Sequence, residues 1–166
     1  SVEELIKILP GPDFPTGGII YDRKAINEAY ASGRGGITIR AVAEIKERKN
    51  AKGEQYNIEI TEIPYQVNKS ELIIKMADLV QSKKIEGIRD IRDESDRNGL
   101  SIIVELKNDA APQKILNQLY EYTDLQKAFH LNMLALYNGL QPQVMSIRDV
   151  IAAHIEHRKI IVRRRA

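Results

Sequence analysis

A glycine-rich turn that contains an arginine, Ser32-Gly33-Arg34-Gly35-Gly36, is the first segment whose residue types could bind phosphate. Loops that bind nucleotides follow the G-x-G-x-x-G or Walker pattern and open a helix. This turn has neither pattern, and it precedes a predicted strand. We therefore predict no nucleotide site here. The turn is expected to end a helix and to direct Arg34 toward a phosphate backbone.

Two segments partly resemble metal sites. Residues 94–105 have Gly and Glu where a calcium loop needs them, but Glu94 replaces the first Asp and the flanks are predicted strands, whereas an EF-hand has helices. His154 and His157 are three residues apart on a predicted helix, whereas zinc-binding pairs are usually four apart and need a third ligand. The sequence thus predicts no metal site, and no arrangement of nucleophile and base emerges.

The seven tyrosines could in principle attack a phosphodiester bond. A phenol has a pKa of about 10, so it needs a nearby cation or base to react at neutral pH. Tyr120 and Tyr122 stand beside Glu121 and Asp124, and neighbouring negative charge raises a phenol pKa. We predict no activated tyrosine, and we expect Tyr56 and Tyr120 to pack in the core.

Lys and Arg are concentrated in two zones of a chain whose net charge is only +2. Residues 23–52 hold eight of them against three Glu, and residues 154–166 hold five against one Glu. Two basic zones on an otherwise acidic chain indicate a local surface for a polyanion. Solvated surface cations are the alternative, and charge alone does not decide between the two.

The elements that must position these cations alternate between strands and helices. Period-2 alternation predicts strands over 37–48, 56–63, 87–92 and 100–107, with turns at 50–53 and 96–99. Helical spacing and caps predict helices over 23–31, 68–83 and 112–120. The order β-β-α-β-β-α predicts an α+β fold, in which helices pack on a mostly antiparallel four-stranded sheet.

The pattern changes after Thr123. A helix is predicted over 124–131, followed by short strands over 132–137 and 143–145. From Ile147 onward, helical spacing predicts a long C-terminal helix with a single apolar stripe, which would pack on something only partly present in this chain. Because the first residue is Ser1 and the last helix has no stop signal, we expect a piece of a longer protein.

Composition excludes several classes of protein. A chain of 166 residues can bury a core, and its 43% hydrophobic content with low net charge excludes disorder. No stretch approaches the roughly 20 apolar residues that span a bilayer. The absence of cysteine excludes disulfides. We expect a cytoplasmic protein without a membrane anchor.

Seven stretches match one known family, and they occur in that family's order along nearly the whole chain. They lie at 11–16 (GPDFPT), 32–35 (SGRG), 60–69 (ITEIPYQVNK), 92–96 (RDESD), 122–126 (YTDLQ), 131–133 (LNM) and 157–164 (HRK with RR at its end). In these stretches the chain resembles the A subunits of DNA gyrase, a family of type IIA DNA topoisomerases. The A subunit of topoisomerase IV is a close paralogue, but residues 63–69 and 151–153 are more similar to gyrase.

The resemblance implies an ATP-hydrolysing enzyme that cuts both strands of one duplex, passes another duplex through and reseals the break; gyrase thereby introduces negative supercoils. It implies that residues 1–22 are a helix end and linker from the winged-helix catalytic domain. Residues 23–123 would be the α+β tower domain, and 124–166 would lead into the coiled-coil arm. The family's nucleophilic tyrosine follows an arginine; Tyr122 follows Glu121, so that role does not carry over.

The implied cofactors and partners belong to the assembled enzyme. Mg²⁺ and ATP would act through the gyrase B subunit, so this fragment is expected to bind no cofactor and to be inactive alone. The implied partners are duplex DNA, the B subunit of gyrase, and a second copy of the A subunit in an A2B2 assembly. The corresponding subunit of topoisomerase IV, which decatenates DNA, is the alternative within the family.

The resemblance also implies that the tower offers a basic surface to the backbone of the duplex that is cut, which is called the gate DNA. We predict contacts from Arg34 in the glycine turn, Arg40 and Lys46 on the first strand, and Lys69 at a helix start. Such contacts neutralise phosphates, so binding is salt-dependent and insensitive to sequence. A stand-alone ferredoxin-like nucleic-acid-binding module is the second hypothesis. It would need aromatic residues for base stacking, which the aliphatic strand at 102–106 lacks.

Overall fold

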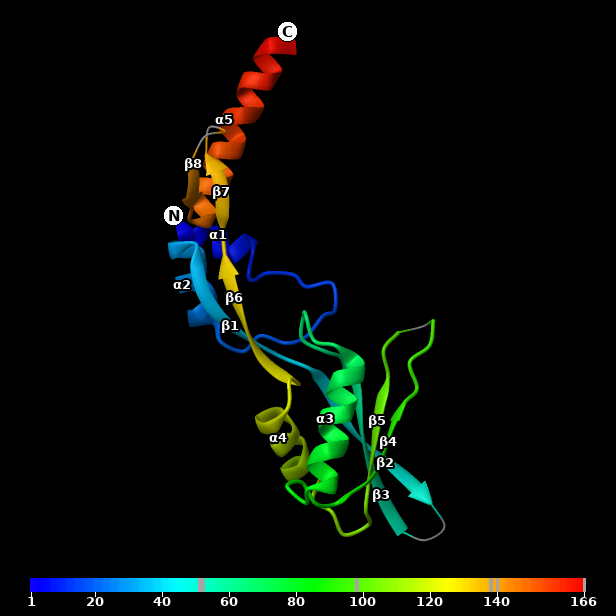
Figure 1. Cartoon of the computed structure of the whole chain (residues 1–166). Coiled ribbons are helices and arrows are strands. Elements are labelled where there is room, and N and C mark those ends of the chain that lie inside the picture. Colours follow the sequence, from blue (N-terminus) through cyan, green and yellow to red (C-terminus); the bar gives the residue numbers. More distant parts are fainter. Residues whose placement is uncertain (51–52, 98, 138, 140, 166) are drawn as a thin grey trace. The chain divides into compact units, whose positions relative to one another are not determined.

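The computed structural model describes residues 1–50, 53–97, 99–137, 139 and 141–165 (Figure 1). The chain divides into two compact units. The sheet unit comprises Phe14–Ile19 and Ile39–Lys127. The helical unit comprises Ser1–Asp13, Ile20–Thr38 and Ala128–Ala166. Strands β1 (Arg34–Arg40) and β6 (Gln126–Asn132) pair with each other, and the division between the units falls within both of them.

The sheet unit contains the predicted four-stranded antiparallel sheet, in the order β2-β3-β5-β4. The strands are β2 (Val42–Asn50), β3 (Gly53–Glu62), β4 (Ile88–Asp93) and β5 (Ile102–Leu106). Helices α3 (Lys69–Gln81) and α4 (Pro112–Tyr122) complete the β-β-α-β-β-α order. The predicted fold class is therefore confirmed.

Alternation along the central strands separates the two faces of this sheet. Ile58 and Ile60 of β3 stand opposite Val104 and Ile102 of β5, and all four are buried. They share one core with Leu72 and Met76 of α3 and with Ile115 and Leu119 of α4. Both helices therefore cover the same face, as Figure 1 shows. The residues that alternate with the buried ones along these strands point to the opposite face of the sheet, which we call the open face.

Local signals account for the ends of these helices. Asn68 caps α3, and its side chain accepts a hydrogen bond from the backbone N–H of Ser70 at 2.9 Å. Helix α4 begins with Pro112, which suits a first helical position because the missing N–H would have no partner there. Tyr56 and Tyr120 lie half-buried against the core, close to the prediction.

The long strand predicted over 37–48 is wrong in one respect, because it is broken into β1 and β2 at Ala41. Arg40 and Ile19 exchange two backbone hydrogen bonds at 2.8 and 2.9 Å, and the next N–H, of Ala41, donates to Leu125 O at 2.7 Å. These partners are distant in sequence, so local alternation did not reveal the break. The predicted turn residues Ala51, Lys52 and Asn98 lie outside the described residues.

The helical unit packs around a second, smaller core of Ile26, Ala29, Tyr30, Ile37 and Ile147. Its helices are α1 (Val2–Ile8), α2 (Arg23–Ser32) and α5 (Ile147–Arg165), and its short hairpin consists of β7 (Leu134–Tyr137) and β8 (Gln141–Val144). The predicted long C-terminal helix is confirmed as α5. Most of its apolar side chains are exposed, Val150, Ile155 and Val162 among them.

The helix predicted over 124–131 is wrong, because Gln126–Asn132 forms strand β6. Phe129 and Leu131 are half-buried and alternate with the exposed side chains of Ala128 and His130. Pairing with β1 satisfies the backbone of this segment, so a tertiary partner overrides a weak local preference. Within the described part of the chain, no helix is both long and apolar enough to cross a bilayer.

Candidate nucleic-acid interface

The glycine turn forms the end of α2, as predicted. Gly33 ends the helix in the left-handed conformation at φ 76°, and its N–H donates to Ala29 O at 2.8 Å. A side chain at Gly33 would collide with the Met145 carbonyl. The Ser32 hydroxyl oxygen lies 2.7 and 2.6 Å from the carbonyl oxygens of Glu28 and Arg34, so its single proton can be donated to either carbonyl and links the end of α2 to the start of β1.

Arg34 is exposed on this rigid turn. Among the described residues, none forms a salt bridge with its guanidinium. A fixed backbone and an available cation are what a contact to a phosphate needs, so the geometry is compatible with the predicted role of Arg34.

Arg40 is held inside the sheet unit. Its Nε and Nη2 donate to Gln126 Oε1 at 2.8 and 2.6 Å, and its Cζ lies 4.7 Å from the centroid of the Tyr120 ring. The Tyr120 hydroxyl donates in turn to Ala41 O at 3.1 Å. Arg40 therefore ties the end of β1 to the start of β6 and to α4. This is a structural use of the guanidinium fork that a lysine could not reproduce.

Lys46 lies on the open face, where it forms an ion pair with Glu59 of the neighbouring strand. This partner raises the Lys46 pKa above its usual value, because the carboxylate accepts a hydrogen bond from the ammonium and attracts its charge. Lys46 is exposed, so the pair is screened by solvent. A phosphate would have to compete with Glu59 for this cation.

Lys69 pairs with Asp93 at the end of β4, with Nζ and Oδ2 2.7 Å apart. Hydrogen bonds from Lys69, then from the hydroxyl and N–H of Ser95, lower the pKa of Asp93 to about 2. The carboxylate therefore stays charged at neutral pH and holds Lys69 at the start of α3. The four predicted cations thus lie on three elements, with Arg34 and Arg40 at the two ends of β1, Lys46 on β2 and Lys69 at the start of α3. Arg40, Lys46 and Lys69 have protein partners.

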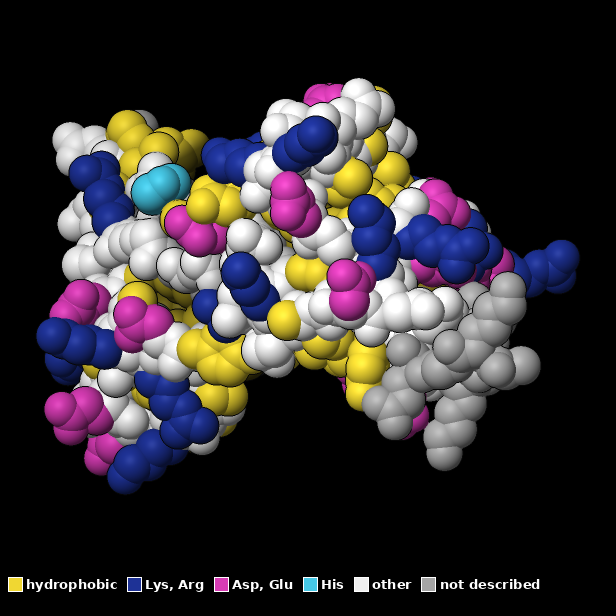
Figure 2. Space-filling view, turned by 90° about the horizontal axis from the view of Figure 1, so that it is seen from below, with side chains coloured by type: hydrophobic (Ala, Val, Ile, Leu, Met, Phe, Trp, Pro, Cys, Tyr) yellow, Lys and Arg dark blue, Asp and Glu magenta, His cyan; other side chains and the backbone are white. Residues whose placement is uncertain are grey.

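The open face as a whole mixes charges of both signs. Arg92 of β4 pairs with Glu105 of β5 at 2.5 Å and with Glu94 at 3.5 Å, much as Lys46 pairs with Glu59. Figure 2 shows Lys and Arg side chains interspersed with Asp and Glu on the side of the molecule that it presents. The basic zone of residues 23–52 therefore does not produce a uniformly basic sheet. Lys52 and the side chains of Arg48 and Lys49 lie outside the described residues.

The segments that resembled metal or catalytic sites have ordinary structural surroundings. Strand β4 ends just before the calcium-like stretch and β5 forms its last residues, where Glu105 pairs with Arg92. His154 and His157 are exposed on α5. Across the described residues, no three His, Cys, Asp or Glu side chains are grouped so that they could hold a metal ion.

The sequence analysis missed a group of lysines at one end of the sheet unit. Lys83, Lys84, Lys107 and Lys114 line one hollow, although they come from three separate segments. The adjacent Lys83 and Lys84, at the end of the helix predicted over 68–83, are the one local signal that could have drawn attention to it.

Comparison with protein families gives a match over the entire chain. The sequence profile of the family formed by the A subunits of DNA gyrase and topoisomerase IV matches residues 1–166. A match of this extent includes both units and every residue of the candidate interface.

Individual relatives agree with the family match. The A subunit of DNA gyrase from Granulibacter bethesdensis is 49% identical over 166 residues, which is 100% of this chain and 17% of that protein. Its counterpart from Escherichia coli is 50% identical over 165 residues, or 99% of this chain and 18% of that protein. The Halalkalibacterium halodurans protein of the same name is also 50% identical over 165 residues, 99% of this chain and 19% of its own length. The chain thus spans less than a fifth of these relatives.

Proposed function

Because the chain belongs to the family of DNA gyrase and topoisomerase IV A subunits, we propose that it is part of the DNA breakage-reunion subunit of a bacterial DNA gyrase. In this proposal it supports the gate DNA segment during ATP-dependent negative supercoiling by double-strand passage. The observation that carries the proposal is the identity of about one residue in two, maintained over the whole chain, to proteins named as the A subunit of DNA gyrase.

The proposed division of labour follows the domains expected from the family. Residues 1–22 would link from the winged-helix catalytic domain, residues 23–123 would form the tower, and residues 124–166 would lead into the coiled-coil arm. The long α5 with its exposed apolar side chains supports the last assignment. The nucleophilic tyrosine would lie outside this chain, which we therefore propose to be inactive alone.

The proposed role of the tower is electrostatic. Arg34, Arg40, Lys46 and Lys69 are the candidates for contact with the DNA backbone. The surroundings of Arg34 support it most strongly, because its turn is rigid and its side chain is exposed. Lys46 and Lys69 would exchange a carboxylate partner for a phosphate. Arg40 would act mainly by holding the strands that present the others.

The cofactors and partners of the whole enzyme are part of the same proposal. Mg²⁺ and ATP would act through the gyrase B subunit, with none bound by this chain. The partners would be duplex DNA, read without sequence preference, together with the B subunit of gyrase, and a second copy of the A subunit in an A2B2 assembly. A cytoplasmic location, where the chromosome lies, fits this role.

The rival ferredoxin-like module is not favoured by the sheet. Such modules stack bases on aromatic side chains of an open sheet face. Here the described open-face residues of the central strands are Gln55, Asn57, Glu59 and Thr61 of β3 and Ile103 and Glu105 of β5. None of these six offers an aromatic ring, and the two glutamates carry negative charge. The open face is therefore a poor base-stacking platform.

The test is the activity of the full-length protein combined with each candidate ATPase partner. We expect ATP-dependent negative supercoiling of relaxed plasmid with a gyrase B partner. Efficient decatenation without supercoiling would instead assign the protein to topoisomerase IV. The absence of both activities, with both partners shown to be active, would overturn the proposal.

A further inference from the structure

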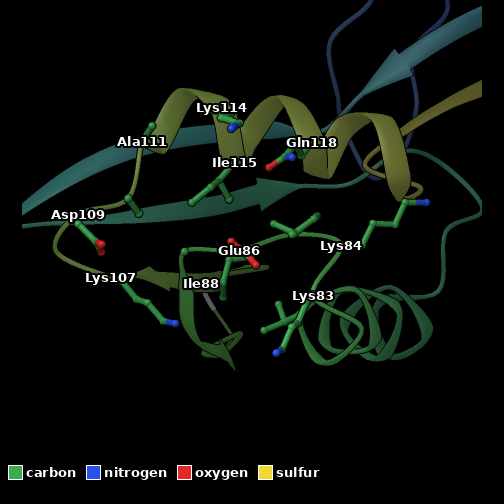
Figure 3. Close-up of a pocket in the computed structure, with 14 residues that line it drawn as sticks. Lys83, Lys84, Glu86, Ile88, Lys107, Asp109, Ala111, Lys114, Ile115 and Gln118 are labelled. Atoms are coloured by element: carbon green, nitrogen blue, oxygen red, sulfur yellow. The ribbon is translucent and has the colours of Figure 1, made fainter.

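A hollow of about 810 Å³ opens at one end of the sheet unit, between the end of α3, the start of β4 and the start of α4. Figure 3 shows four lysines around it: Lys83 and Lys84 from the loop after α3, Lys107 from the end of β5, and Lys114 from α4. We call these four residues the lysine pocket. Glu86 and Asp109 are the acids in its lining, so a net positive charge of two remains.

The cations of the lysine pocket differ from those of the open face because their charges are not satisfied internally. Lys83, Lys107 and Lys114 are exposed, and no salt bridge joins them to any acid in the described part of the chain. Lys84 Nζ lies 4.1 Å from the centroid of the Tyr122 ring, a contact that leaves its positive charge uncompensated. Like charges repel, so grouping four lysines has an energetic cost that a bound anion would relieve.

The backbone that carries these lysines is firmly held. The N–H groups of Lys84 and Ile85 both donate to Leu79 O, at 3.0 and 3.1 Å, and Lys107 N–H donates to Gly87 O at 2.8 Å. Buried Ile85, Ile88 and Ile115 form the floor. The lysines therefore project from a fixed base, which reduces the entropy that a ligand would have to remove on binding.

Lys83 occupies a backbone conformation that disfavours its own side chain. Its φ is 58°, in the left-handed region that glycine adopts more readily. A lysine at such a position places a cation beside the hollow at the expense of local strain. The conformation itself belongs to the end of α3, where the N–H groups of Lys83 and Lys84 donate to Val80 O and Leu79 O at 3.1 and 3.0 Å.

We propose that the lysine pocket is a second contact of this protein with the phosphate backbone of duplex DNA. The inference rests on the proposed function, which supplies DNA as the polyanion. The residue type fits: lysine acts on phosphate as a mobile point charge, whereas arginine makes the planar bidentate contacts used to read bases. The pocket holds four lysines and no arginine, so its contact with DNA is independent of base sequence.

The experiment measures duplex DNA binding by the full-length protein as a function of salt. One variant carries Lys83→Gln, Lys107→Gln and Lys114→Gln. The matched control carries Lys7→Gln, Lys75→Gln and Lys127→Gln, which remove the same charge from exposed positions outside the pocket and both basic zones. Each phosphate contact contributes about 0.9 to the slope of log K against log salt, so we expect the pocket variant to lose about 0.9 to 2.7. We expect the slope of the control variant to fall by less than about 0.9, the contribution of a single phosphate contact.

The outcomes separate this inference from the proposed function. Equal affinity and slope for the two triple variants, in a protein that binds DNA and supercoils, would overturn the lysine pocket alone. Absence of DNA binding by the unsubstituted protein would overturn both. Restoration of the slope by arginine at the same three positions supports the pocket, because charge is kept while the side chain changes.

The single change Lys83→Gly distinguishes a ligand contact from a structural role. Glycine tolerates φ 58°, so we expect the midpoint of thermal unfolding to stay the same or to rise. We also expect DNA affinity at low salt to fall. A variant with full DNA affinity would overturn the assignment of Lys83.

Discussion

The open face of the sheet and the lysine pocket belong to the same unit, yet they treat their cations in opposite ways. On the open face, Lys46 and Arg92 each have a carboxylate partner on the next strand, Glu59 and Glu105. In the lysine pocket, the cations outnumber the acids by two and have no salt-bridge partner among the described residues. A paired cation stabilises the fold modestly, whereas an unpaired one is available to a ligand. Local charge counts in a sequence do not distinguish these cases.

The open face and the lysine pocket rest on the same hydrophobic core. A substitution that disrupts this core should therefore have the largest effect, because it affects both regions. Ile58 is fully buried between β2 and β5 and under the two helices. We expect Ile58→Ala to lower the free energy of unfolding by about 2–5 kcal/mol, because it leaves a cavity. Urea unfolding followed by far-ultraviolet circular dichroism measures this loss. Ile74→Ala on the exposed side of α3 is the control; similar losses for the two variants would contradict the assigned core.

Substitutions of Arg40 test whether this cation of the predicted interface stabilises the fold instead of binding DNA. Its hydrogen bonds to Gln126 and its stacking on Tyr120 lead us to expect Arg40→Ala to cost about 1–3 kcal/mol of stability. Arg40→Lys should recover little of this, because an ammonium lacks the planar fork. Thermal unfolding of the two variants measures the effect. A stable Arg40→Ala variant with weakened DNA binding would return Arg40 to the interface.

The sequence predicts the sheet unit well because its signals are local. Alternation in β3 and β5, the Asn68 cap and Pro112 each specify an element without reference to distant residues. The helix expected over 124–131 was wrong because β6 forms by pairing with β1, more than 80 residues earlier. A partner at that separation leaves little trace in the local pattern.

The candidate site was less predictable than the fold, again because of distance. Whether Lys46 is available depends on the register of the β2–β3 hairpin, which places it diagonally across from Glu59. The lysine pocket depends on β5 lying next to β4, which brings Lys107 and Lys114 to the loop that holds Lys83. Sequence reasoning found the cations of the first basic zone by their density. It could not rank them without knowing their partners.

The open face should gain affinity for DNA when its acids are neutralised. Glu59→Gln releases Lys46, so we expect tighter DNA binding by the full-length protein at low salt and a slope of log K against log salt steeper by up to about 0.9. The double variant with Arg34→Ala and Lys46→Ala should bind DNA more weakly than the parent. Most of the loss should come from Arg34→Ala, because Lys46 is already paired with Glu59. Fluorescence anisotropy with a labelled duplex measures both. If Glu59→Gln leaves affinity and slope unchanged, Lys46 does not contact DNA.

The smallest expected effect comes from the Lys69–Asp93 pair, and it appears only in acid. The folded-state pKa of Asp93 is about 2, below the ordinary value of about 3.9 that applies in the unfolded chain. At any pH above that ordinary value, the charged carboxylate therefore stabilises the folded state in full. Its contribution is lost as the pH falls through the range from roughly 5 to 1. We expect Asp93→Asn to be slightly less stable than the parent at pH 7, and the difference to shrink steadily toward pH 2. Unfolding midpoints across this range measure the difference. A gap that is the same at pH 7 and pH 2 would show that the charge of Asp93 does not stabilise the fold, so that a phosphate could replace this partner of Lys69 without loss of stability.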